Sequence, residues 1–341
     1  MTKILITGAT GAIGSEILYQ LKAAGKLDNV TVLARSSKST TKCLKPFADS
    51  IKIISGDITD IDVVRSAVKG QNIVIHLAAV IPTVEDNNDA LVHRVNVGGT
   101  ENIVRCMEAE CPDAMLLFSS SIAIYGDRIL DPEIYITDPP KGLDHDNYSR
   151  TKVEAEAIIT SSKLKWSIFR LTAIMGIGNH KMSGIMFLVP LETPFEIATV
   201  RDTARAFVNA LDHQKELMGK LFNLGGGKEC RITYFDFMSK AFNAFGLGNV
   251  DFPNFAFAKK NFHCGHYADG DELEKIIHFR SDNIESYFKR FRSSVPEIQR
   301  FFTLPFKGII KWFLLKLSAP YKAYKKGDTE QIKFFFGNIE K

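Results

Sequence analysis

The chain has 341 residues, of which 45% are hydrophobic and 24% are charged. This composition is typical of a folded protein with a large core and excludes a disordered chain. The net charge is only +4, from 43 basic and 39 acidic residues. Overall charge therefore indicates no nucleic-acid partner.

The sequence also indicates the state of the cysteines, the absence of a metal-binding motif and the cellular location. Its five cysteines are odd in number and contain no CxxC pair, which predicts free thiols in a reducing compartment. The run His263-Cys264-Gly265-His266 lacks a second cluster at zinc spacing, so we expect no metal site. No signal peptide precedes the first strand, and no uncharged apolar run reaches about 18 residues. We expect a soluble, cytoplasmic protein.

The first structural signal is a short apolar strand at residues 3–7, followed by a glycine-rich turn. The glycines are spaced GxxGxxG, and apolar residues then recur at helical spacing. The order strand, turn, helix aims free backbone amides at an anion, and glycine permits close approach to a pyrophosphate. We therefore expect a dinucleotide to contact Gly8, Gly11, Ala12, Ile13 and Gly14.

The second strand, at residues 30–33, ends without the acidic residue that would bind both adenosine ribose hydroxyls. Instead the chain places Arg35, Ser36 and Lys38 there. The planar guanidinium of Arg35 suits a phosphate, and the other two residues add donors. The pattern favours NADP as the cofactor over NAD.

Further strands and helices alternate along the chain. The alternation of continuous apolar strands with helices predicts an α/β fold, a Rossmann-type doubly wound parallel sheet with helices on both faces. From residue 226 the alternation fades and aromatic residues accumulate, which predicts a smaller C-terminal substrate lobe. We expect a dinucleotide-binding domain at 1–225, with a substrate-lobe insertion near 171–200, and a lobe with an amphipathic tail at 226–341. Strands are expected at 51–54, 73–77, 115–118, 166–169 and 221–224, and helices near 61–69, 89–110, 146–162 and 202–212.

The ends of the third and fourth strands should complete the cofactor site. Asp57, followed by Ile58, could accept a hydrogen bond from the adenine amine. The small residues of Leu77-Ala78-Ala79 would let the backbone lie close to the nicotinamide half. We expect the preceding His76 to be a packed residue and not a catalyst.

A serine-rich strand end and a YxxxK pair carry the candidate chemistry. Ser121 ends the fifth strand, and Tyr148 and Lys152 share one face of a helix at i,i+4. A phenol has a pKa near 10, which a nearby ammonium and an oxidised nicotinamide would lower. A second YxxxK, at Tyr321 and Lys325, lies in a basic tail and is expected to be a solvated face.

Taken together, these residues resemble the extended branch of the short-chain dehydrogenase/reductase family, the NAD(P)-dependent epimerase/dehydratase type. The resemblance implies that Tyr148 transfers the proton, that Lys152 binds the nicotinamide ribose and lowers the Tyr148 pKa, and that Ser121 bonds the substrate oxygen. The matching motifs run in family order over about residues 3–227. They are the three glycines, Asp57-Ile58, His76 to Ala79, Asn96 to Thr100, Ser119 to Gly126, Tyr148 and Lys152, Arg170, Met175 to Gly178, Val200 to Asp202 and Phe222 to Gly226.

Two departures from the family pattern bear on the reaction. The segment 171–200 is shorter than in sugar-nucleotide epimerases and shows no recognisable diphosphate-binding residues. Ile122 and Ala123 follow the catalytic serine, where dehydratases often have acidic residues. We therefore predict an NADP-dependent oxidoreductase acting on a secondary alcohol or ketone, with Val80, Ile81 and Pro82 beside an apolar or mixed substrate.

Two alternatives stay open at this point. A nucleotide-sugar epimerase would keep its cofactor bound and return the hydride. A non-catalytic NADP-binding regulatory protein would not need the intact serine, tyrosine and lysine.

Two association surfaces are also predicted. Relatives often dimerise through two helices per subunit, here 89–110 and 146–162. Near the C-terminus an apolar stripe at helical spacing predicts a helix over 305–317, with the basic segment 322–326 after it. This stripe either packs on the enzyme body or lies in a membrane interface, with contact through 305–326. The stripe consists of Phe306, Ile309, Ile310, Phe313, Leu314 and Leu317.

Overall fold

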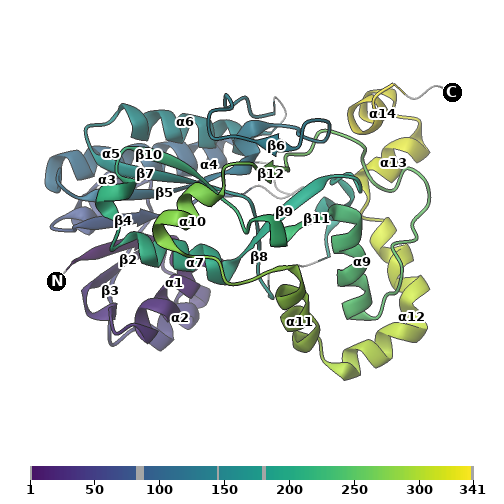
Figure 1. The fold of residues 1–341 in the computed structure, drawn as a ribbon, viewed down its shortest axis with the longest axis horizontal. Helices are drawn as coiled ribbons and strands as arrows, with labels where there is room; N and C mark the ends of the chain where they lie inside the picture. The colour runs from purple at the N-terminus through teal and green to yellow at the C-terminus, as the bar shows by residue number, and fades with distance from the viewer. Residues whose placement is uncertain (1, 82–87, 144–145, 179–181, 339–341) are drawn as a thin grey trace.

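The computed structural model describes residues 2–81, 88–143, 146–178 and 182–338. Its centre is a seven-stranded parallel sheet in the order β10-β7-β5-β4-β1-β2-β3 (Figure 1). The order reverses at β1, which pairs with β2 on one side and β4 on the other. The carboxyl ends of the strands meet at this crossover, where open α/β sheets bind their ligands. The strands are β1 Ile4–Thr7, β2 Val30–Ala34, β3 Lys52–Ser55, β4 Ile73–His76, β5 Met115–Ser121, β7 Lys165–Leu171 and β10 Lys220–Leu224.

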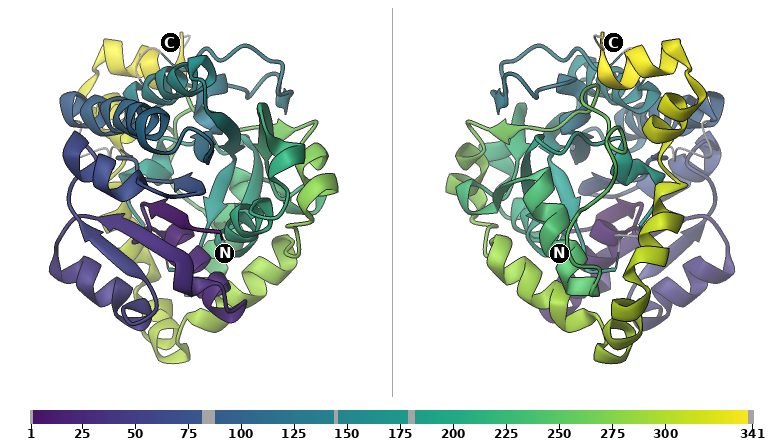
Figure 2. Two further views of the ribbon diagram at one scale, coloured as in Figure 1. Left: turned by 90° about the vertical axis from the view of Figure 1, so that its left-hand side faces the viewer. Right: turned by 90° about the vertical axis from the view of Figure 1, so that its right-hand side faces the viewer.

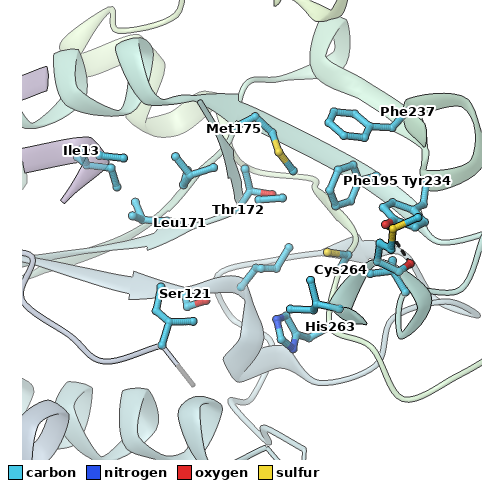
Figure 3. A pocket seen from close by; sticks show the side chains of 18 of the residues that line it. Ile13, Ser121, Leu171, Thr172, Met175, Phe195, Tyr234, Phe237, His263 and Cys264 are labelled. Atoms are coloured by element: carbon cyan, nitrogen blue, oxygen red, sulfur yellow. Dashed lines mark hydrogen bonds between the residues drawn. The ribbon is translucent and has the colours of Figure 1, made fainter. Parts of the chain in front are cut away.

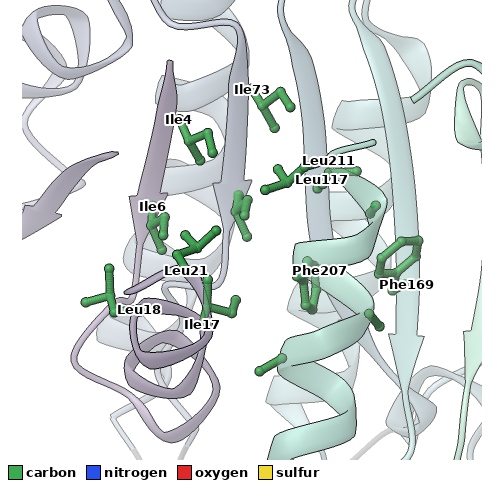
Figure 4. Close-up of a cluster of buried hydrophobic side chains, with 14 of the residues drawn as sticks. Ile4, Ile6, Ile17, Leu18, Leu21, Ile73, Leu117, Phe169, Phe207 and Leu211 are labelled. Atoms are coloured by element: carbon green, nitrogen blue, oxygen red, sulfur yellow. The ribbon is translucent and has the colours of Figure 1, made fainter. Parts of the chain in front are cut away.

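Helices cover both faces of this sheet, so alternate strand residues enter two different cores. Ile4 and Ile6 of β1 belong to one cluster, which Figure 4 shows, whereas Leu5 belongs to the other. Because both faces are buried, the strands carry continuous apolar runs. The predicted doubly wound fold is confirmed. The first cluster packs against α1 Ala12–Ala23, α2 Lys38–Leu44, α7 Val200–Ala210 and α10 Asp271–Ile277, and the second against α3 Ile61–Val68, α5 Gly99–Glu110 and α6 Asn147–Ser161.

The helix predicted over 89–110 is divided into three parts. Helix α4 spans Asp89–His93, a π-helical turn follows at Arg94–Gly98, and α5 begins at Gly99. Wider turns of this kind re-aim side chains and are frequent at functional sites. Here the turn carries Asn96, which bonds the backbone of Val80 beyond β4.

A second lobe is built mostly from the chain beyond Leu224, and it is largely helical. Two small sheets connect it to the main body, in the orders β11-β9-β8 and β12-β6. Residues 266–277 return to the main sheet, where Leu273 and Ile277 of α10 enter its core. The chain therefore passes from the second lobe back to the main sheet. The predicted domain boundary at residue 225 stays a prediction. The elements are β6 Glu133–Ile134, β8 Ala173–Met175, β9 Pro194–Thr199, β11 Arg231–Thr233, β12 His266–Tyr267, α8 Gln214–Leu217, α9 Tyr234–Phe245, α11 Ile284–Ser294, α12 Glu297–Leu315, α13 Ala319–Lys326 and α14 Thr329–Phe336.

Helix α12 begins at Glu297, eight residues before the predicted start at Pro305. The proline lies inside the helix, where it lacks the N–H that an i→i−4 bond needs. In the part of the chain that the structure describes, no helix is long and apolar enough to cross a membrane.

Candidate active site

The first edge of the site is the glycine turn between β1 and α1. Gly8 has a φ of +74°, and an added Cβ would stand 2.7 Å from the Ala78 backbone nitrogen. A Cβ on Gly14 would stand 2.4 Å from the Gly8 carbonyl oxygen, so both positions require glycine. Gly11 is the N-cap of α1 and supplies no side-chain capping bond. The first helical amides are therefore available to an anion, and the turn fits a dinucleotide pyrophosphate.

A cavity of about 290 Å³ lies beside this turn, at the carboxyl ends of β1 to β4. Its lining includes Arg35, Asp57 and Ile58. The Thr59 amide donates to Asp57 at 2.9 Å and lowers the pKa of that carboxyl, and the Arg35 charge adds to the effect. The cavity therefore offers a carboxylate acceptor and a guanidinium donor to a bound adenosine.

The three residues predicted to select NADP differ in position. Arg35 is exposed and lines the cavity. Ser36 and Lys38 are also exposed, but they lie outside the cavity lining. They flank Ser37, whose hydroxyl accepts from the Thr40 amide and caps α2. Of the three, Arg35 is the best placed to meet a phosphate on the adenosine ribose.

His76, at the end of β4, is a packed structural residue. It is completely buried, and burial lowers its pKa to about 3, so the ring is neutral. Its Nδ1 lies 2.8 Å from the Thr7 hydroxyl and its Nε2 lies 3.1 Å from that of Thr100. The Thr100 hydroxyl donates to the Asn96 carbonyl and the Thr7 hydroxyl accepts from the Ala78 amide. The histidine thus fixes the end of β4 against the glycine turn.

The polar residues of the candidate chemistry meet where β5 approaches α6. Ser121 is the last residue of β5, and its hydroxyl accepts from the Ala123 amide at 3.2 Å. The same hydroxyl lies close enough to the Tyr148 phenol to lower its pKa. Tyr148 lies in the first turn of α6, which Asp146 caps by accepting from the Ser149 amide. The structure therefore brings Ser121 and Tyr148 together at one point of the cavity wall.

Lys152 lies one helical turn after Tyr148 on α6 and is buried. Its ammonium donates to the Ser119 carbonyl oxygen at 2.7 Å and lies 5.9 Å from the centre of the Tyr148 ring. Burial lowers the pKa of Lys152 to about 8, which the charge of Glu156 partly opposes. The lysine remains mostly charged at neutral pH.

Burial has the largest effect on the pKa of Tyr148. Burial raises it to about 12, the bond from Ser121 opposes the rise, and the Asp146 charge adds to it. Desolvation outweighs the neighbouring groups, so the pKa lies above that of a free phenol. The phenol therefore keeps its proton at neutral pH, which is the state that a general acid needs. The lowering by Lys152 together with an oxidised nicotinamide stays a prediction.

A buried polar network holds α6 in place. Glu156, one turn after Lys152, accepts two bonds from Arg170 of β7, at 3.0 and 2.7 Å. Arg170 also donates to the Tyr125 hydroxyl, which in turn donates to Asn223 of β10. Glu156 was not predicted from the sequence, although it lies four residues after Lys152 on the same helix face.

A larger cavity of about 650 Å³ runs from the glycine turn past Ser121 and Tyr148 into the C-terminal lobe. Figure 3 shows Ile13 and Ser121 toward one end and Phe195, Tyr234 and Phe237 toward the other. The wall at the lobe end is made mainly of aromatic rings and methionines. These include Met175, Met186, Phe195, Phe237, Met238, Phe242, Phe288 and Phe291.

Near the candidate catalytic residues Ser121, Tyr148 and Lys152, the large cavity has few polar groups. Ser120 is buried at 2% exposure, and its hydroxyl has no hydrogen-bond partner among the described residues. His263 and Cys264 also line the cavity, and His263 Nδ1 lies 3.4 Å from Asp146 Oδ2. The lobe thus contacts the cap of the helix that carries Tyr148.

The predicted substrate residues near Val80 are only partly placed in this cavity. Ile81 lines it, and Pro82 lies outside the described residues. Val80 lines the smaller, adenosine-side cavity instead, because Asn96 bonds both its N–H and its C=O and holds the strand end there. Leu77 and Ala79 line both cavities, and Ala78 lines the adenosine side.

Relatives of known name are similar over the nucleotide-binding half. A 3 beta-hydroxysteroid dehydrogenase/Delta 5-->4-isomerase of Mycobacterium tuberculosis is 26% identical over 226 residues, 62% of this chain and 58% of that protein. A UDP-glucose 4-epimerase of Yersinia pestis is 31% identical over 194 residues, 54% of this chain and 55% of that protein. The chain thus spans little more than half the length of these curated relatives.

A solved structure extends the similarity of fold. A dTDP-glucose 4,6-dehydratase from Streptomyces venezuelae, with NAD and TYD bound, superposes with a TM-score of 0.71 at 18% identity, covering 86% of this chain and 96% of that one. The model of the NAD dependent epimerase/dehydratase family matches residues 4–225. This match covers the glycine turn, Ser121, Tyr148 and Lys152, and the chain belongs to the NAD dependent epimerase/dehydratase family.

Proposed function

We propose that the protein is an NADP-dependent oxidoreductase that interconverts a bulky, apolar secondary alcohol and the corresponding ketone. The proposal goes beyond family membership, because members of the family that this chain resembles include dehydrogenases, dehydratases and epimerases by name.

The proposed substrate class rests on the residues that line the large cavity. Among its described lining residues, Lys152 is the only lysine or arginine, and its ammonium is engaged by Ser119 at the catalytic end. A nucleotide sugar brings a diphosphate, which needs several cationic or amide donors when buried. A wall of aromatic and methionine side chains instead favours an apolar body with one polar oxygen.

The polar residues support the chemistry at that oxygen. A bound nicotinamide would supply or accept the hydride. In the direction of reduction, the Ser121 hydroxyl donates a hydrogen bond to the ketone oxygen, and Tyr148 gives that oxygen its proton. Lys152 holds positive charge beside the phenol and is placed to bond the nicotinamide ribose. The net reaction consumes one ketone, one reduced cofactor and one proton.

Arg35 supports NADP as the cofactor. It stands at the end of β2 in the cavity that would receive the adenosine ribose, and the described lining there contains no carboxylate on β2. The Asp57 carboxylate lies after β3 and is engaged by Thr59.

The test is a screen of bulky alicyclic ketones and nucleotide sugars, each with NADPH, following the absorbance of reduced cofactor. We expect net oxidation of NADPH with an alicyclic ketone and an equal yield of alcohol. A nucleotide sugar converted without net oxidation would identify an epimerase and overturn the proposal. Binding of NADPH without turnover of any compound tested would favour the regulatory alternative.

A further inference from the structure

Helix α12 turns an apolar face to solvent along its whole length. The residues of this face recur at helical spacing, and each is more than half exposed. Ordinary surface helices show the reverse arrangement, with apolar residues inward. The face includes Ile298, Phe301, Phe302, Ile309, Trp312 and Phe313.

The opposite face of α12 contacts the protein and uses both apolar and charged residues. Ile310 and Leu314 pack on the cluster that contains Phe242 and Met186, and the ammonium of Lys311 bonds Asp251. Only some residues of the predicted apolar stripe, such as Ile310 and Leu314, are therefore packed against the rest of the protein. Phe306, Ile309 and Phe313 remain 53 to 57% exposed.

The shape and position of α12 suit a flat surface. Its 19 residues give a length of about 28 Å at 1.5 Å per residue. It forms the outer rim of the C-terminal lobe and is followed by α13, with α14 beyond (Figures 1 and 2). At one end the Lys316 ammonium lies 3.4 Å from the centre of the Trp312 ring, a pair that combines apolar and charged groups as interfacial residues do.

The charge around this face decides what can cover it. Residues 289–326 contain ten lysines and arginines and one acidic residue, Glu297, a net charge of +9 in a chain whose total is +4. A second copy of the chain would bring the same charge to a shared interface. An anionic lipid surface complements it.

We propose that α12 lies in the interface of an anionic bilayer, with its exposed apolar face in the acyl boundary. Lys316, Lys322, Lys325 and Lys326 then face the phosphate headgroups. The docking itself does not depend on the proposed reaction. If that reaction is correct, docking also brings the substrate cavity close to the lipid. Phe242 and Met186 line the cavity and belong to the same hydrophobic cluster as Ile310 and Leu314 of α12.

The test is co-sedimentation of the full chain with vesicles of phosphatidylcholine alone or mixed with phosphatidylglycerol. We expect binding to the anionic vesicles that weakens as salt rises. The triple variant Phe302→Gln, Ile309→Gln and Phe313→Gln should lower partition at least about tenfold, because it removes large apolar groups from the buried face. A control variant, Leu130→Gln with Met218→Gln, alters exposed apolar residues outside α12 and should bind within about twofold of the unchanged protein.

A second readout reports the helix directly. The chain has two tryptophans, so in Trp166→Phe the fluorescence comes from Trp312 and should shift to the blue on adding anionic vesicles. Full-length protein that stays in the supernatant at low salt would overturn the proposal, as would a triple variant that binds like the unchanged chain. Sedimentation velocity showing a dimer that only the triple variant dissociates would assign the face to a second copy and also overturn it.

Discussion

Glu156 and Arg170 form a bidentate ion pair in which both side chains are at least nine-tenths buried, with N–O distances of 3.0 and 2.7 Å. The pair joins α6, which carries Tyr148 and Lys152, to β7, the strand between β10 and β5 in the main sheet. A buried charge pair one turn beyond Lys152 thus ties α6 to the main sheet.

Breaking this pair should destabilise the fold strongly. Glu156→Gln leaves the Arg170 charge buried and uncompensated, and we expect a loss of about 3–5 kcal/mol in the free energy of unfolding. Denaturant titration measures it, and Arg170→Met in the same background should recover part of the loss. A value within about 1 kcal/mol of the unchanged protein would contradict this role.

Arg35→Asp should reverse the cofactor preference. The change removes a charge-assisted bond and adds a repulsive charge, so NADP affinity should fall about tenfold or more. Lys38→Asp makes the same charge change outside the cavity lining and should have a smaller effect. Calorimetric titration with both cofactors measures the affinities. Tighter binding of NAD than NADP by the unmutated protein would refute the assignment.

The pKa of Lys152, lowered by burial to about 8, predicts an alkaline limit to function. Below this pH the ammonium is charged and can hold the nicotinamide ribose. Above it the neutral amine dominates, so kcat/KM should fall about tenfold per pH unit. Lys152→Arg keeps the charge at all accessible pH values and should flatten this limb, even at reduced activity. An unchanged limb in that variant would show that another group titrates.

Ala241, on α9, provides a test of the substrate cavity. Ala241→Phe should fill part of the cavity, raising KM for a bulky ketone about tenfold while changing KM for a small cyclic ketone little. Asn243→Phe adds the same ring on the exposed side of α9 and serves as the matched control. Equal effects of both variants on both substrates would argue against binding in this cavity.

The fold was largely predictable because strands buried on both faces must be continuously apolar. The expected strand at 115–118, for example, is found as Met115–Ser121. The π-helical turn at 94–98 was not predictable, since its apolar spacing is compatible with an uninterrupted helix. Pro305 gave a wrong helix start because it lies inside α12, which begins at Glu297.

The site was predictable only in part. Motif position selected Tyr148 and Lys152, but Glu156 was missed because an isolated acidic residue on a helix usually faces solvent. Phe195, Phe237 and Phe288 come from three separate elements, and no local pattern shows that they share a cavity. The homodimer through 89–110 and 146–162 and the cytoplasmic location stay predictions.

The most direct test of the proposed chemistry compares the unchanged protein with Tyr148→Phe, measuring NADPH oxidation with a bulky alicyclic ketone and NADPH affinity in parallel. The variant removes one hydroxyl, so turnover should fall about 10²–10⁴-fold while cofactor affinity and the unfolding transition stay unchanged. Retention of more than about a tenth of the activity would contradict proton transfer by Tyr148 and, with it, the proposed mechanism.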